Sequence, residues 1–69
     1  MNLKHLTYMA NQIAQNFAVQ GDEVAAAATA QHLKLFWDPR MKAEILDGDR
    51  AGLEPIAKAA VELLGYTSS

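Results

Sequence analysis

Apolar side chains recur every three or four residues in the first quarter of the chain. They lie at Leu3, Leu6, Met9, Ala10, Ile13, Ala14 and Phe17. A period of 3.6 residues is typical of a helix with one apolar face. Asn2 can cap the start of this helix, and Gly21 lies just past its end. The pattern predicts a helix over residues 3–19.

The second apolar pattern is built mainly of alanine. Asp22 is the expected N-cap, and Glu23 lies in the first turn, where a carboxylate opposes the positive end of the helix dipole. Alanine has the highest helix propensity and little bulk, so the run AAAATA at residues 25–30 favours a helix that a neighbour can approach closely. Heavier apolar residues follow on one stripe, at Leu33, Phe36 and Trp37. We predict a helix over residues 23–36.

A corner is predicted where the stretch FWDPRM occupies residues 36–41. Pro39 disfavours helical dihedral angles at Asp38, so the second helix must end there. Asp38 can then cap a third helix in which Pro39 is the first residue. This helix is expected over residues 39–47, with Met41 packed behind the corner and Gly48 as its stop. The structural residues of the corner are therefore Phe36, Asp38, Pro39 and Met41.

The last helix follows a polar loop, GDRAGLE. Pro55 suits the first position of a helix, and the apolar residues after it continue at helical spacing. Gly65 is the expected stop, so the helix is predicted over residues 55–64 and residues 65–69 form a frayed tail. Without any alternating strand pattern, the sequence predicts an all-α fold, a compact bundle of about four short helices in one domain, residues 1–69.

The size and composition of the chain indicate a small domain whose stability would increase on binding a partner. A domain of 69 residues buries only roughly 60% of the surface of its unfolded chain. The chain has no cysteine, which excludes a disulfide framework, thiolate metal sites and iron–sulfur clusters. Self-association into a homodimer, or binding to another protein, is therefore the expected source of further stability.

Charge and hydropathy narrow the choice of partners. Six lysines and arginines are scattered among eight aspartates and glutamates, for a net charge of −2. Nucleic acid is not an expected partner, because binding to phosphates needs a basic face. No apolar run approaches the ~18 residues of a membrane span, and the N-terminus lacks the apolar core of a signal peptide. We expect a cytoplasmic protein without a membrane partner.

The loop between the last two helices bears a partial likeness to a calcium loop. In the stretch DGDRAG, Asp47 and Asp49 fall on the first and third ligand positions, and Gly52 falls on the required glycine. Ala51 stands where a further oxygen ligand belongs, and Lys58 replaces the bidentate glutamate. We expect no metal here, and a helix stop followed by a solvated turn.

Side chains suited to catalysis are few. The only two histidines, His5 and His32, have no neighbouring ligands at the spacing of a zinc site, which needs three or four converging donors. The sequence also lacks a glycine-rich phosphate loop, and its last serines, Ser68 and Ser69, lie in the tail. We predict no catalytic, cofactor-binding or metal-binding residues in this chain.

Three short motifs carry a resemblance to a known family. They are MANQI at residues 9–13, HL…FWDPRM at residues 32–41, and GLEP at the start of the last helix. In this order they resemble the delta subunit of NAD-dependent, molybdenum-containing formate dehydrogenases. The resemblance implies a small accessory subunit of a cytoplasmic complex. It also implies that the larger subunits carry the molybdopterin guanine dinucleotide, the iron–sulfur clusters and the flavin, and that this chain binds none of them.

Two functions fit the sequence. The first is a non-catalytic subunit that assembles or stabilises a formate dehydrogenase through contacts with its larger subunits. The alternative is a self-contained helical module that binds a ligand or metal, through the DGDRAG loop or a pocket under Phe36 and Trp37. The missing ligands at Ala51 and Lys58 favour the first function.

Arg40 is the residue of FWDPRM that the predicted fold explains least. A cation in the first turn of a helix opposes the helix dipole at a cost of about 0.3–1 kcal/mol. An ion pair with Glu44, one turn later, is one explanation. The other is a carboxylate on a partner. Because tryptophan and arginine are enriched at interface hot spots, we predict that Trp37 and Arg40 form part of the surface that binds the larger subunit.

Overall fold

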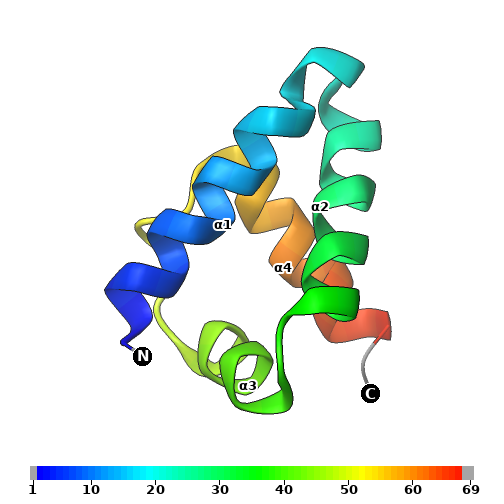
Figure 1. Ribbon diagram of the computed structural model, residues 1–69. Coiled ribbons are helices and arrows are strands. Elements are labelled where there is room, and N and C mark those ends of the chain that lie inside the picture. Colours follow the sequence, from blue (N-terminus) through cyan, green and yellow to red (C-terminus); the bar gives the residue numbers. More distant parts are fainter. Residues whose placement is uncertain (1, 68–69) are drawn as a thin grey trace.

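The computed structural model describes residues 2–67, which fold into helices without a strand (Figure 1). The elements are α1 (Leu3–Phe17), the 3₁₀ helix η1 (Ala18–Gln20), α2 (Asp22–Phe36), α3 (Pro39–Asp47) and α4 (Pro55–Thr67). The predicted all-α class and its four α-helices are confirmed over these residues. None of the helices in the described part is long and apolar enough to cross a membrane.

The first two helices form a hairpin, and the other two close it. In Figure 1, α1 rises to the turn at η1 and α2 descends from it, while α4 crosses behind the pair and α3 lies below their open end. The largest helix–helix contact joins α2 to α4, and α1 contacts the other three helices. The corner FWDPRM therefore lies where α2, α1 and α3 come together.

The core combines a few large side chains with many alanines. Its fully buried large residues are Leu6, Leu33, Ile45, Val61 and Leu64, and its buried alanines are Ala10, Ala14, Ala25, Ala26, Ala30, Ala57 and Ala60. The alanine-rich helix was predicted to allow a neighbour to come close. In the structure, that helix is α2, and it packs extensively against α4. Small side chains bring the helix axes together, since no bulk separates the backbones.

Most helix starts follow the predicted local chemistry. The side-chain oxygen of Asn2 accepts a hydrogen bond of 2.8 Å from the backbone N–H of His5. Asp38 caps α3 in the same way through the backbone N–H of Met41, at 2.9 Å. Pro39 and Pro55 are the first residues of α3 and α4. These four assignments are confirmed.

The expected cap at Asp22 is wrong. Asp22 is the first residue of α2, and Gly21 takes the capping position without any side-chain hydrogen bond. Gly21 has a φ of 99° and a ψ of 152°, a backbone conformation that only glycine adopts readily. The first helix, predicted to residue 19, ends at Phe17 because the chain tightens into η1 before this glycine.

Gly65 does not end the last helix, which continues through it to Thr67. A side chain here would meet a neighbour, since an added Cβ would lie 3.4 Å from Cδ2 of Leu46. The glycine thus lies against α3 inside a helix, where the sequence pattern alone indicated a stop. Of the tail predicted to be frayed, residues 65–67 are helical, and residues 68–69 lie outside the described part.

Candidate functional site

The two adjacent aromatic residues of the corner lie in the opposite environments to those predicted. Trp37 is 5% exposed and belongs to the core, whereas Phe36 is 72% exposed. Trp37 follows the fully buried Leu33 by four residues and donates its backbone N–H to the Leu33 carbonyl, so both share the inner face. Phe36 instead lies with its ring centroid 4.7 Å from that of His32. The placement of Trp37 on the outer surface is wrong, and Phe36 is the exposed aromatic.

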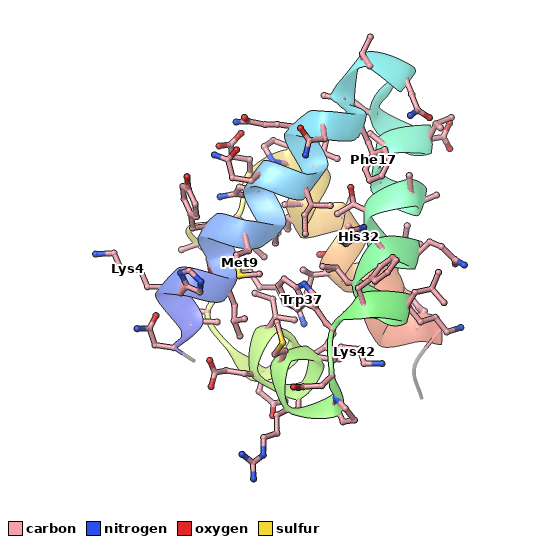
Figure 2. All side chains as sticks on the ribbon, in the orientation of Figure 1. Lys4, Met9, Phe17, His32, Trp37 and Lys42 are labelled. Atoms are coloured by element: carbon pink, nitrogen blue, oxygen red, sulfur yellow. The ribbon has the colours of Figure 1, made fainter. Side chains whose placement is uncertain are left out.

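A groove runs between α1 and the second half of α2, down to α3. Its lining consists of Tyr8, Met9, Gln12, Ile13, His32, Phe36, Trp37 and Met41, around a volume of about 460 Å³. Figure 2 shows Met9, from α1, on the same side of the molecule as His32 and Trp37, which lie at the C-terminal end of α2. We call this feature the α1–α2 groove. Aromatic rings and methionines dominate it, and no acidic side chain lines it.

Arg40 lies in a different cleft, beside the first turn of α3. Asp38, Glu44, Met41 and Leu6 line this cleft with it, around a volume of about 400 Å³. The Oε2 atom of Glu44 is buried and has no hydrogen-bond partner. Arg40 lines the same cleft and is exposed, and it forms no hydrogen bond with that oxygen. Trp37 and Arg40 thus line two separate cavities, which share only Met41.

Asn11 makes a connection that the sequence patterns did not indicate. Its Nδ2 donates to the carbonyl of Gly52 at 3.0 Å, and its Oδ1 accepts from the backbone N–H of Glu54 at 2.9 Å. One side-chain amide therefore holds the backbone on both sides of Leu53, just before α4 begins. These bonds connect two of the sequence motifs, MANQI and GLEP, so both motifs contribute to holding the fold together.

The acidic loop is held by its own side chains. Asp49 Oδ1 accepts a hydrogen bond of 2.9 Å from the backbone N–H of Ala51, and Arg50 Nη2 donates to the carbonyl of Leu46 at 2.8 Å. Within residues 2–67, no three side chains of histidine, aspartate or glutamate converge in a way that could hold a metal ion. The geometry of this loop is that of a helix stop and a turn.

The two histidines lie apart from any acid–base arrangement. His5 is exposed in the first turn of α1, where its backbone N–H serves the Asn2 cap. His32 is half-buried on the wall of the α1–α2 groove, against Phe36. Of the two cavities beside the corner, the α1–α2 groove has the more apolar lining.

Comparison with known proteins assigns most of this chain to one family. The family model described as the NADH-dependent formate dehydrogenase delta subunit, FdsD, matches residues 5–61. The match includes Asn11 and its backbone partners, the corner at Asp38–Pro39 and all residues of the α1–α2 groove. No curated protein and no solved structure matches the chain.

Proposed function

The chain belongs to the family of NADH-dependent formate dehydrogenase delta subunits, and from this premise we propose that it is a non-catalytic accessory subunit. Its task is to assemble or stabilise the enzyme complex through contacts with the larger subunits. The observation that carries the proposal is the family match over residues 5–61 of a chain of 69.

The surface of the chain supports a role in protein contact. Tyr8 and Phe36 are 61% and 72% exposed on neighbouring helices, beside a groove with a tryptophan and two methionines. Aromatic residues and methionine are enriched in the buried centres of protein interfaces. A domain of this size also gains stability from a partner, because its own core is small.

The chemistry of formate oxidation belongs, in this proposal, to the larger subunits. The delta chain supplies no catalytic residue and holds no cofactor, metal or nucleic acid. It acts in the cytoplasm, where the larger subunits fold and receive their cofactors. Before it meets them it exists as a folded monomer or as a homodimer.

The test is to produce the larger subunits of the same enzyme with and without this chain. The yield of assembled complex, its cofactor content and its formate-dependent reduction of NAD⁺ are then measured. We expect the chain to co-purify with the complex, and its omission to lower the yield or the thermal stability of the complex. Equal yield, stability and activity in both preparations would contradict the proposal. Turnover of formate by the isolated chain would contradict its non-catalytic part.

A further inference from the structure

We propose that residues 38–51, which contain α3, open as a unit while α1, α2 and α4 stay folded around their own core. We call these residues the α3 segment. In the open form the segment leaves the bundle and loses its helical hydrogen bonds. The inference concerns a motion of this chain and does not depend on the proposed function. Its basis is the fixed ends of the segment, the little that α3 buries, and an unpaired carboxylate oxygen beneath it.

Both ends of the α3 segment adjoin residues that are fixed in the core. Trp37, directly before it, is buried and donates its backbone N–H to the carbonyl of Leu33. Directly after it, the carbonyl of Gly52 accepts a hydrogen bond of 3.0 Å from Asn11, and the next residue, Leu53, is buried. Local opening can therefore begin and end at these fixed points without disturbing the helices on either side.

The other three helices pack against one another without the α3 segment. Each of α1, α2 and α4 contacts the other two, and the contacts of α3 with α1 and with α4 are smaller than any of these. Figure 1 shows α3 at the edge of the bundle, below the open end of the α1–α2 hairpin. Every buried apolar residue of the described chain except Ile45 lies outside the segment. Opening therefore uncovers only the side of the core that faces α3.

Helix α3 itself is held to the bundle by few side chains. Ile45 is the only fully buried residue among its nine, and Met41 and Leu46 are partly buried against the core. Its side-chain hydrogen bond to α2 runs from Lys42 Nζ to the carbonyl of Lys34, at 3.3 Å and exposed to solvent. A helix of this length is not stable alone in water. Once released from the bundle it unfolds, and its amide hydrogens exchange with solvent.

The packed position of α3 leaves one polar atom without a partner. The Oε2 atom of Glu44 is buried and forms no hydrogen bond within the described residues. Glu44 lines the cleft between α3 and Leu6 of α1. A buried carboxylate oxygen without a donor destabilises the packed form, because it has lost its hydrogen bonds to water. Opening returns this oxygen to solvent, so Glu44 favours the release of α3.

Hydrogen exchange of the full chain, followed by NMR at several urea concentrations below the unfolding transition, tests the proposal. The amides of residues 42–48 report on α3, and those of Leu33 and Val61 report on α2 and α4. Relative to their intrinsic rates, we expect residues 42–48 to exchange at least about tenfold faster than the two reporters. Their rates should also depend less on urea, because partial opening exposes less surface than global unfolding. Equal protection and equal urea dependence in all helices would overturn the proposal.

A matched pair of exposed alanines separates the opening of α3 from global unfolding. Ala43 lies in α3 and Ala27 in α2, each inside its helix. Replacing either by glycine should shift the unfolding equilibrium of its helix about four- to fivefold. We expect Ala43→Gly to speed the exchange of residues 42–48 by that factor. Ala27→Gly should speed exchange in α2 and α4 and leave residues 42–48 unchanged. Equal acceleration of residues 42–48 by both variants would show that α3 unfolds only with the whole chain, which contradicts the proposal.

The contribution of the unpaired oxygen is tested with Glu44→Met, which replaces the carboxylate by an apolar group. Glu62→Met is the control, because Glu62 is exposed in α4 and the two residue types have similar helix propensities. We expect Glu44→Met to slow the exchange of residues 42–48 at least about threefold, since no polar atom is then left unpaired. Glu62→Met should leave their exchange unchanged. Unchanged or faster exchange of residues 42–48 in Glu44→Met would overturn the role assigned to Glu44.

Discussion

The side-chain oxygen of Asn11 accepts a hydrogen bond of 2.9 Å from the backbone N–H of Glu54, the residue directly before α4. The same amide donates to Gly52, so α1 fixes the position at which the last helix begins. The bonds join residues more than forty positions apart. They connect the two halves of the chain directly, whereas the backbone hydrogen bonds of a helix join residues only four positions apart.

Asn11→Ala should therefore lower stability. Two hydrogen bonds are lost, each worth about 0.5–1.5 kcal/mol in net terms. For a domain of this size, a loss of 1 kcal/mol lowers the melting temperature by about 4–8 °C. Thermal unfolding followed by circular dichroism measures the effect.

The control for this prediction is Asn16→Ala. Asn16 is exposed on the same helix, so the change has the same effect on helix propensity without touching the loop. We expect this variant to melt at or slightly above the wild-type temperature. Equal melting temperatures for Asn11→Ala and Asn16→Ala would mean that the Asn11 bonds contribute nothing to stability.

The Asp38 cap gives a second prediction. Asp38→Ala leaves the backbone N–H of Met41 without its partner at 2.9 Å, which should cost about 0.5–2 kcal/mol. Asp38→Asn keeps a side-chain oxygen in the same place and should retain most of the stability. Urea unfolding curves of both variants give the comparison. A loss of similar size in both would show that the charge of Asp38, and not its cap, matters.

The aromatic pair gives a third prediction. Trp37→Ala removes a buried side chain and should cost about 3–5 kcal/mol, enough to unfold a marginal domain. Phe36→Ser removes an exposed ring and should change stability by about 0.5 kcal/mol, as surface substitutions usually do. Far-UV circular dichroism at 25 °C separates an unfolded variant from a folded one. A folded Trp37→Ala and an unfolded Phe36→Ser would contradict the structure of the corner.

Thr29 gives a fourth prediction, of increased stability. Its side chain is fully buried, and its Oγ1 has no hydrogen-bond partner. Thr29→Val has the same shape and removes the unsatisfied hydroxyl, whose burial costs about 1–3 kcal/mol. We expect a higher melting temperature for Thr29→Val and a lower one for Thr29→Ser, which keeps the hydroxyl and loses the methyl group. A Thr29→Val variant less stable than the wild type would imply a partner for this hydroxyl.

Features set by neighbouring residues were predictable from the sequence. Asp38 and Pro39 act within a single turn, so their residue types were enough to place the start of α3. The burial of the two aromatic residues was also predictable from their spacing. Trp37 lies four residues after the apolar Leu33 and so shares its inner face, whereas Phe36 lies four residues after the polar His32. The sequence prediction instead relied on the general enrichment of tryptophan at interfaces, which does not determine which way a side chain points.

Features set by distant residues were not predictable in this way. The bonds of Asn11 to the loop before α4 depend on how α1 and α4 pack. Nothing in the residues next to Asn11 in the sequence indicates these bonds. Gly65 lies inside α4 and next to Leu46 of α3, a neighbour that the sequence around Gly65 does not indicate. The α1–α2 groove likewise arises from three segments, and only their packing brings its residues together.

The alanines between α2 and α4 limit how this chain can vary over evolution. Ala25, Ala57 and Ala60 are completely buried on α2 and α4, the two helices with the largest contact. A larger residue at any of these positions would need space that a closely packed core lacks. Ala25 belongs to the run AAAATA, whose repetitive composition suggests that any of its residues could be replaced. Its packing implies the reverse. The exposed Ala27 can take almost any helix-forming residue, while the buried Ala25, two positions earlier, accepts little beyond glycine or serine. In this chain, low sequence complexity and low tolerance of substitution therefore occur in the same run of residues.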